Sequence, residues 1–424
     1  MSLRILPVAL ALLLLAAASA RGETPASTAI RPDGSSGAAA LEAPGSPGEP
    51  VAVRVAAGLN AATNLAFGPD GTLYFGEWKT GAVYPIGPDG RPVRYGTPVI
   101  DVGEPAWGNE RGFIGLAVGP DGEFYTFTTY AKPGGGWFNR LSRWDAGVET
   151  PLLDNLDAGD WHNAGRIQVD ARDGTLWVAY GDVNKYAVAQ DPTDLRGSIL
   201  HMTRDAKPVA GNVAADSLVW SYGHRQPFGF AVDPVSGRVM VAENMDKKND
   251  EVSLVAPGGN HGWPLCEGPC VPARDGFIDP VLYYPETIGP TSGAYLGGHF
   301  YFGDFNHGQV HRVHRGADGG WADEIVYKHP RAPILDLKPG PEGNTLYFST
   351  WSDIWKLTFP NVVPTNGTDP FPNATRPPPN GTFGPPTGPT GPSDGPAPRP
   401  TPAWGAIGVV ATFALAGLAR RLPR

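Results

Sequence analysis

The sequence has few of the features that mark metal-binding, nucleic-acid-binding or helical proteins. Only two cysteines occur in 424 residues, and no histidine lies near them at the spacing of a zinc site. The formal net charge is −9, and no basic cluster interrupts the middle of the chain. A nucleic-acid partner is therefore disfavoured, because it needs concentrated positive charge. Long stretches of helical periodicity are also absent, which leaves an all-β fold as the expectation.

Both ends of the chain lack the pattern of a folded domain. The apolar run "ILPVALALLLLAAASA" ends in small residues and predicts a signal peptide over residues 1–20, cleaved after Ala20. Residues 21–50 are rich in Ala, Gly, Pro and Ser and predict a flexible spacer. Residues 360–402 are rich in Pro and Gly and predict a stalk, because they cannot bury a core. The stalk carries the three Asn-X-Thr sequons of the chain, which a glycosylating host would modify: Asn366, Asn373 and Asn380.

The C-terminal residues predict a membrane anchor. Residues 403–419 are uncharged, which is the short limit for a membrane span, and a basic tail over residues 420–424 fits a cytoplasmic end. The segment also resembles the C-terminal sorting tails of prokaryotic surface proteins. We therefore expect an exported protein, extracellular or on the cell surface. Its C-terminal segment is expected to anchor it in the membrane. In such a protein, Cys266 and Cys270 are expected to form a small disulfide loop.

One pattern recurs between residues 51 and 359: an apolar strand, a tight turn and a second apolar strand. Examples are "LAFGPDGTLYFGE", "LAVGPDGEFYTFT", "IQVDARDGTLWVAYGD", "FAVDPVSGRVMVAE" and "LKPGPEGNTLYFST". The turns at Gly68, Gly119 and Ala171 are 51 and 52 residues apart, which is the length of a four-stranded propeller blade. A longer gap has room for two blades, with the missing hairpin around Gly297. The sequence therefore predicts a six-bladed β-propeller of four-stranded blades.

Six ordered sequence blocks resemble a known family. They are "NERGFIGLAVGPDG", "HNAGRIQVDARDGTLWVAYGD", "AQDPTDLRGSIL", "VWSYGHRQPFGFAVDP", "NDEVSLVAPGGNHGWP" and "PTSGAYLGGHFYFGDFNHGQV". Over roughly residues 52–358 the domain resembles the glucose/sorbosone dehydrogenase family, six-bladed propellers typified by soluble sugar dehydrogenases that use pyrroloquinoline quinone. The resemblance implies oxidation of the C1 hydroxyl of a sugar to a lactone. The sugar is then a small-molecule partner, and the electron acceptor is unknown.

The resemblance also implies roles for particular residues. His162 matches the histidine that takes the proton of the sugar hydroxyl while hydride passes to the quinone. Arg225 and Gln226 match a pair that contacts the quinone, and Glu110 stands where the family often has glutamine. A calcium-binding segment of the family is matched by three residues with oxygen ligands: Asn244, Asp250 and Glu251.

The chain departs from the family where the cofactor's negative charge is bound. A lysine of the family falls on Asn306, and an arginine pair falls on Pro333 and Leu335. Pyrroloquinoline quinone carries three carboxylates, whose desolvation is costly without cationic partners. Arg331 and His307 lie near these positions in the sequence and could substitute for the lost cations.

Other functions stay open on the sequence alone. The propeller could have lost the quinone and serve as a carbohydrate- or protein-binding surface module, or it could be a calcium-dependent lactonase-like hydrolase with oxygen ligands from Glu77 and Asn64. His162 could also be a structural loop residue, and Arg225 could brace neighbouring blades through a carboxylate. The Asp250-Glu251 pair could be ordinary loop charge, and His261 and Trp263 are expected to serve packing and turns.

Overall fold

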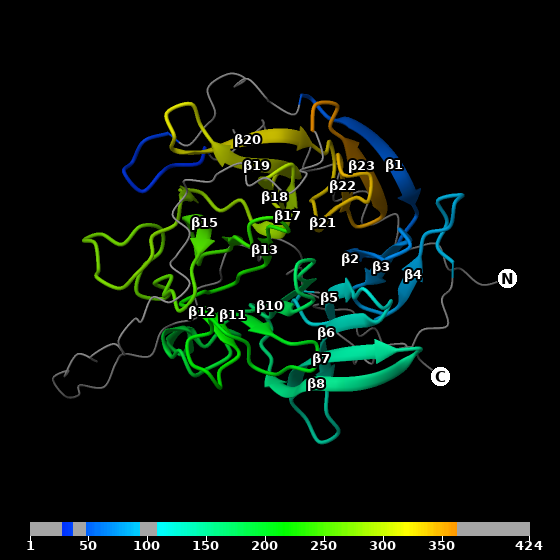
Figure 1. Cartoon of the computed structure of the whole chain (residues 1–424), viewed down its shortest axis with the longest axis horizontal. Coiled ribbons are helices and arrows are strands. Elements are labelled where there is room, and N and C mark those ends of the chain that lie inside the picture. Colours follow the sequence, from blue (N-terminus) through cyan, green and yellow to red (C-terminus); the bar gives the residue numbers. More distant parts are fainter. Residues whose placement is uncertain (1–27, 37–47, 94–107, 363–424) are drawn as a thin grey trace, which may run out of the picture.

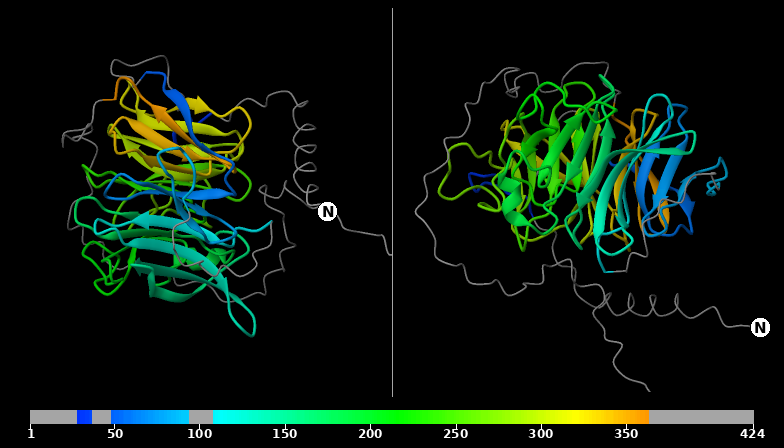
Figure 2. Two further views of the ribbon diagram at one scale, coloured as in Figure 1. Left: turned by 90° about the vertical axis from the view of Figure 1, so that its right-hand side faces the viewer. Right: turned by 90° about the horizontal axis from the view of Figure 1, so that it is seen from below.

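The computed structural model describes residues 28–36, 48–93 and 108–362. Its strands form six antiparallel sheets arranged in a ring (Figure 1). Side views show the same sheets standing next to one another as blades (Figure 2). Five blades have four strands, and the first has three strands among the described residues. The predicted all-β six-bladed propeller is therefore confirmed.

The first three blades follow the chain in order. Blade 1 contains β2 (Ala62–Phe67), β3 (Leu73–Glu77) and β4 (Val83–Pro85). Blade 2 contains β5 (Phe113–Val118), β6 (Phe124–Ala131), β7 (Trp137–Asp145) and β8 (Val148–Asp157). Blade 3 contains β9 (Ala164–Val169), β10 (Leu176–Tyr180), β11 (Ser198–Met202) and β12 (Val219–Tyr222), with a short 3-10 helix, η1 (Tyr186–Gln190), between β10 and β11.

The other blades complete the ring. Blade 4 contains β13 (Gly229–Val232), β14 (Val239–Glu243), β15 (Asp250–Val255) and β16 (Leu282–Tyr284). Blade 5 contains β17 (Pro290–Leu296), β18 (His299–Asp304), β19 (Gln309–Arg315) and β20 (Trp321–Lys328). Blade 6 contains β21 (Asp336–Pro339), β22 (Thr345–Ser349) and β23 (Asp353–Thr358), and its outer strand is β1 (Val51–Ala57) from the start of the domain.

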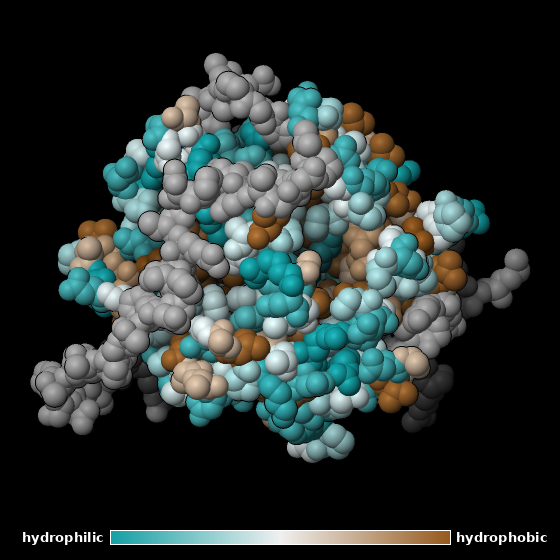
Figure 3. Space-filling model, in the orientation of Figure 1, coloured by the Kyte–Doolittle hydropathy of each residue, from teal (hydrophilic) through white to brown (hydrophobic). Residues whose placement is uncertain are grey.

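The pairing of β1 with β23 closes the ring. Val51 lies opposite Thr358 and Ala57 opposite Asp353 in an antiparallel register with one irregularity. The first strand of the domain thus completes the last blade, and its hydrogen bonds to β23 join the N-terminal and C-terminal ends of the propeller. As an outer strand, β1 exposes Val51 and Val53, and apolar surface gathers along the outer edge where β1 lies (Figure 3).

The recurring turns explain why the hairpins form where the sequence predicts them. Gly71 adopts a φ of 82°, a left-handed conformation that favours glycine. Asp70 accepts hydrogen bonds from the backbone and the hydroxyl of Thr72, which fastens the turn between β2 and β3. Middle strands such as β10 and β14 are buried along their whole length. Blades on both sides cover them, so their sequences are mostly apolar, with Glu243 at the end of β14 as an exception.

The Arg166 side chain lies at the centre of the ring, in the space between the inner strands that we call the channel. It starts on the inner strand β9 and donates hydrogen bonds to the carbonyls of Thr63, Ile114, Thr291 and Leu335, which belong to four other blades. Burial lowers the pKa of its guanidinium, although Asp336 raises it. A single side chain thereby ties the inner ends of five blades together.

Blade 5 contains a buried ionic group. The His311 ring lies between the carboxylates of Asp323 and Asp304, at 2.9 and 3.0 Å. Burial alone would lower the pKa of His311, but the two aspartates raise it to about 10. Asp304 also accepts a hydrogen bond from the backbone of His307. The charged histidine therefore supports the loop between β18 and β19.

Part of the segment before β1 contacts blade 4. Ile30 exchanges backbone hydrogen bonds with Tyr283 on the outer strand of blade 4, and Ala29 is buried. Ile30, within the predicted spacer, therefore pairs with the outer edge of blade 4.

The other predicted terminal segments cannot be assessed in the same way. The signal peptide, the stalk beyond residue 362 and the membrane segment lie outside the described residues. Within the ranges that the structure describes, no helix is long and apolar enough to cross a membrane.

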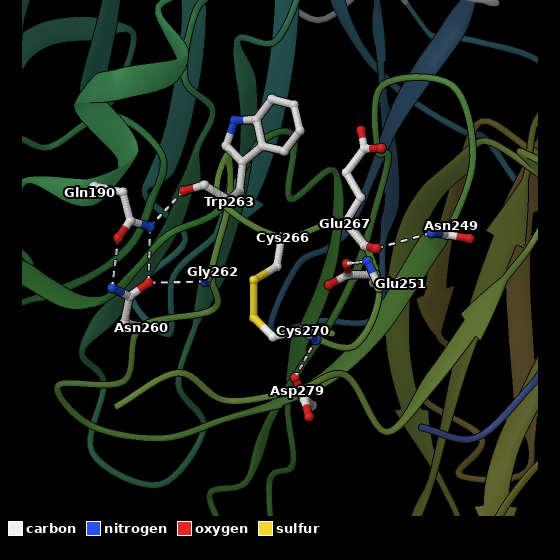
Figure 4. The surroundings of a disulfide bond; sticks show 11 residues. Gln190, Asn249, Glu251, Asn260, Gly262, Trp263, Cys266, Glu267, Cys270 and Asp279 are labelled. Atoms are coloured by element: carbon white, nitrogen blue, oxygen red, sulfur yellow. Dashed lines mark hydrogen bonds between the residues drawn. A yellow bond between two sulfur atoms is a disulfide. The ribbon is translucent and has the colours of Figure 1, made fainter. Parts of the chain in front are cut away.

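The predicted disulfide is present between Cys266 and Cys270 (Figure 4). It closes a small loop in the long connection between β15 and β16. The Cys270 backbone donates to Asp279, and Gly268 donates to Glu251. In the same connection, the Trp263 carbonyl accepts a hydrogen bond from Gln190 of blade 3. The disulfide loop thus belongs to a segment that links blades 3 and 4.

Candidate active site

His162 and Asp182 form a buried pair at one end of the channel. We call this end the channel mouth: it carries the connections that enter each inner strand and the loops between the second and third strands of each blade. His162 lies just before β9, and Asp182 follows β10 in the same blade. The His162 Nδ1 atom lies 2.7 Å from Asp182 Oδ1. A carboxylate only accepts hydrogen bonds, so Nδ1 is the donor, and Nε2 is the nitrogen that carries the lone pair in the neutral form of the ring.

The backbone around this pair is strained. His162 has a φ of 62° and Val183 a φ of 47°, although neither residue is a glycine. A branched side chain such as valine rarely adopts this conformation, and such outliers concentrate at functional sites. The strain brings the Val183 amide within hydrogen-bonding distance of the His162 carbonyl, at 3.1 Å. Gly181 also passes so close to His162 that a Cβ there would lie 2.1 Å from the same carbonyl.

Glu110 connects two other predicted site residues. Its Oε2 atom accepts hydrogen bonds from the His162 backbone at 2.6 Å and from the Gln226 side chain at 2.7 Å. Gln226 in turn accepts a bond from the Ala164 backbone. Glu110 therefore fixes the loop of His162 to the segment that enters blade 4.

Arg225 is largely but not fully paired. One guanidinium nitrogen donates to the carbonyls of Asn244 and Met245, and the other approaches Asp246 at 3.3 Å. The remaining donor, Nε, is buried and has no hydrogen-bond partner among the residues that the structure describes. An unpaired buried donor is costly, so this atom is a candidate contact for an anionic ligand.

Two aromatic residues that the sequence assigned to packing or did not single out belong to the site. Trp263 donates its indole N–H to Asp182 Oδ2 at 2.8 Å. Tyr186 lies against both rings, 5.1 Å from Trp263 and 6.2 Å from His162 between centroids. Asp182 and Trp263 both stand at the ends of quoted family blocks, which is the signal that could have found them.

The predicted calcium residues are largely committed to the protein's own backbone. Both oxygens of Asp250 accept backbone N–H groups, from Met245 and from Ile288 and Gly289. The Asn244 amide donates to the Pro290 carbonyl. Glu251 accepts a hydrogen bond from the Gly268 backbone, and its other oxygen is buried without a partner in the described part of the chain. Burial and the nearby Glu243 hold the pKa of Glu251 well above its usual value. No group of three or more His, Cys, Asp and Glu in the described ranges could hold a metal.

The positions where the family has cations do not supply them here. The Asn306 amide donates to the Thr287 carbonyl. Leu335 is buried, and Pro333 is partly exposed. His307 approaches Asp304 at 3.5 Å, and Arg331 is exposed.

Other cations lie at the mouth. The Lys79 ammonium donates to the carbonyls of Asn109 and Arg111, on either side of Glu110. Burial lowers the pKa of Lys79 to about 8, although Glu110 raises it. Arg111 pairs with Asp160 at 2.7 Å. The sequence did not predict a role for Lys79 or Arg111, because neither residue matches a cation of the family's cofactor site.

The oxygen ligands suggested for a lactonase are used elsewhere. Asn64 accepts a hydrogen bond from Arg166 in the channel and donates to the Phe113 carbonyl. Glu77 accepts from Thr80 and Asn60. The geometry therefore does not support a metal site at Asn64 and Glu77.

The sequence profile of glucose/sorbosone dehydrogenases matches residues 59–350. The chain belongs to the glucose/sorbosone dehydrogenase family. This confirms the resemblance inferred from the sequence blocks, and the match covers all six blades.

Proteins similar to this chain include two that are named as sugar dehydrogenases. An aldose sugar dehydrogenase of Escherichia coli is 31% identical over 151 residues, which are 32% of this chain and 40% of that protein. Quinoprotein glucose dehydrogenase B of Acinetobacter calcoaceticus is 24% identical over 248 residues, 50% of this chain and 51% of that protein. The matched segments thus span about half or less of these curated relatives.

Solved structures cover the family's propeller more fully. The PQQ-bound form of aldose sugar dehydrogenase from Streptomyces coelicolor is 26% identical, with a TM-score of 0.65 over 73% of this chain and 98% of that chain. A putative oxidoreductase (glucose dehydrogenase) of Thermus thermophilus is 27% identical, with a TM-score of 0.63 over 73% of this chain and 99% of that chain. The propeller of this chain is therefore similar to theirs along nearly their whole length.

Proposed function

We propose that this chain is an aldose dehydrogenase that uses a bound quinone to oxidise the C1 hydroxyl of a sugar to a lactone. The observation that carries the proposal is the pair of His162 and Asp182, which leaves one imidazole nitrogen ready to accept a proton at the channel mouth. The relatives named as aldose sugar dehydrogenases supply the reaction type.

The residues at the mouth fit pyrroloquinoline quinone with a different set of cations from the family's. Three carboxylates need buried donors and positive charge. Arg225 offers a buried Nε without a partner, and Gln226 follows it in the chain. Lys79 and Arg111 add two positive charges in place of those lost at Asn306, Pro333 and Leu335. When bound, the quinone would accept the hydride that leaves C1 of the sugar.

The protein's own part in the reaction is to accept and stabilise a proton. His162 Nε2 takes the proton of the C1 hydroxyl as the hydride departs, so the sugar loses two electrons and two hydrogens in one step. Asp182 stabilises the imidazolium that forms and keeps the ring oriented. Trp263 and Glu110 hold Asp182 and the His162 backbone in place.

The proposal is tested by reconstitution. We expect the purified protein to bind the quinone, seen as cofactor absorbance, and to reduce a dye with at least one member of an aldose panel. Asn306→Lys adds a cation at an exposed position and is expected to tighten quinone binding about tenfold. Asn344→Lys, in the hairpin at the opposite end of the blades, is the matched control and should leave the affinity unchanged.

Absence of quinone binding at micromolar concentration in both the native protein and Asn306→Lys would overturn the proposal. It would favour instead a propeller that has lost its cofactor and serves as a binding module. The titration is run with and without calcium, because a calcium requirement stays a prediction from the resemblance.

We further propose that the protein is exported and held at the cell surface by its C-terminal segment. The apolar residues 403–419 and the basic residues after them support this. Deleting residues 403–424 is expected to release the protein from the membrane fraction into the medium, as measured by immunoblotting. Deleting residues 366–387, a stalk segment of the same length, should leave it membrane-bound. A protein that stays with the membrane after the first deletion would contradict the anchor.

A further inference from the structure

Three aromatic side chains from three neighbouring blades form a row at the channel mouth. Phe305 follows β18 in blade 5, Trp351 follows β22 in blade 6, and Trp78 follows β3 in blade 1. The ring centroids of Phe305 and Trp351 are 6.0 Å apart, and those of Trp351 and Trp78 are 5.9 Å apart. All three side chains are partly exposed. We call these residues the aromatic shelf.

The backbone holds the shelf in place. The Ala61 amide donates to the Trp351 carbonyl, and the Trp78 amide donates to the Ala61 carbonyl. The segment before β2 therefore ties the loops of blades 6 and 1 together. The Phe305 amide donates to the Gly289 carbonyl. The Lys79 ammonium lies 3.5 Å from the centroid of the Trp78 ring, and the Trp351 ring stacks on the same Trp78 at 5.9 Å. Rigid aromatic groups of this kind bind a ligand at low cost in conformational entropy.

The shelf is continuous with the His162 site. The Trp78 indole N–H donates to the Glu110 carbonyl at 3.3 Å. The carboxylate of the same Glu110 accepts the His162 backbone N–H. Glu110 therefore links the shelf directly to the loop of His162, the candidate base. The shelf and this loop both lie at the channel mouth.

The chemistry of the shelf suits a neutral sugar ring. A pyranose has a face of C–H groups that packs on an aromatic ring and a rim of hydroxyls that need hydrogen bonds. Two exposed asparagines adjoin the shelf in the chain: Asn306 follows Phe305, and Asn60 precedes Ala61. The Asn306 side chain donates to the Thr287 carbonyl, which holds this amide in place. At Asn306 the amide replaces a family cation, which changes the loop from a partner for carboxylates to one for hydroxyls.

We propose that the aromatic shelf is a second sugar subsite, so that the substrate is a neutral oligosaccharide whose reducing end reaches His162. Trp351 and Phe305 contact the sugar units beyond the one that is oxidised, and Trp78 positions Trp351. This inference rests on the proposed function for the reducing-end unit, but binding at the shelf itself needs no quinone.

The test measures binding and oxidation separately. Maltotriose, cellotriose and glucose are titrated into the protein without quinone by calorimetry, and their kcat/KM values are then compared with quinone and dye. We expect a trisaccharide to bind more tightly than glucose. Trp351→Ala and Phe305→Ala should each weaken trisaccharide binding about tenfold. The same variants should change the affinity and the kcat/KM for glucose less than twofold. Trp321→Ala is the matched control, because Trp321 is partly exposed on β20 and lies after a turn at the other end of blade 5.

The outcomes separate the subsite from the dehydrogenase reaction. If Trp351→Ala weakens trisaccharide binding but no sugar is oxidised, the subsite is supported and the proposed dehydrogenase function is contradicted. Oxidation with equal preference for glucose and trisaccharides, unchanged in both shelf variants, overturns the subsite and keeps the function. A loss of quinone affinity in Trp351→Ala with unaltered sugar binding also overturns it, because the shelf would then bind the cofactor.

Discussion

His162→Gln is expected to lower turnover by roughly 100-fold or more while leaving thermal stability and quinone binding unchanged. The reason is that loss of hydride from an alcohol without removal of its proton builds up a protonated carbonyl. Glutamine retains the size of the side chain but cannot accept the proton. The measurement is dye reduction at saturating sugar and quinone, together with the melting temperature of the same preparation.

The control is a histidine with a packing role. His201 is buried on β11 and stacks on Trp177 with centroids 3.8 Å apart, and burial lowers its pKa to about 4. His201→Gln should therefore lower the melting temperature and leave turnover nearly normal. If His162→Gln instead behaves like His201→Gln, with stability lost and activity kept, His162 is a structural residue and not the base.

Arg166→Met is expected to lower the free energy of unfolding by about 4 kcal/mol, the scale for breaking a buried, paired charge. Methionine fills much of the space but donates no hydrogen bond, so the carbonyls of Thr63, Ile114, Thr291 and Leu335 lose a donor in the channel. Arg166→Lys should be nearly as harmful, because one ammonium cannot reach acceptors on four blades. Denaturant unfolding followed by tryptophan fluorescence measures the loss.

A surface arginine provides the comparison. Arg204 pairs with Asp121 and Glu123 but is more than one-third exposed. Arg204→Met should therefore cost less than about 1 kcal/mol. Equal losses for Arg166→Met and Arg204→Met would show that the channel network adds nothing to the ordinary cost of removing an ion pair.

The propeller could be predicted because its cause is local. Each hairpin needs an Asp-Gly or similar turn between two apolar runs, and the spacing of the turns reports the length of a blade. The closure of blade 6 by β1 was not foreseen, because the strands that pair, Val51–Ala57 and Asp353–Thr358, lie at opposite ends of the domain. The hydrophobic pattern of β1 shows a strand but does not show its partner.

The candidate site was predicted only in part, for the same reason. His162, Glu110, Arg225 and Gln226 lie in recognisable blocks, and the structure brings them together at the mouth. The calcium residues were inferred from the resemblance to a segment of the family, and the fold turns both Asp250 oxygens toward backbone amides. The donors that the Asp250 carboxylate meets include Ile288 and Gly289, which are 38 and 39 positions away in the sequence. A local sequence pattern does not show such partners.

The amino-acid sequence by itself determined the all-β repeat, the disulfide loop of Cys266 and Cys270, and the block that contains His162, because these depend on turns and spacings within a few dozen residues. Only the tertiary structure decided which groups act on one another. Trp263 is 81 positions from Asp182, to which it donates a hydrogen bond, and Arg166 is 169 positions from its acceptor Leu335. Such contacts form when blades pack in a ring, and a periodic pattern of apolar residues does not specify which polar groups meet at its centre.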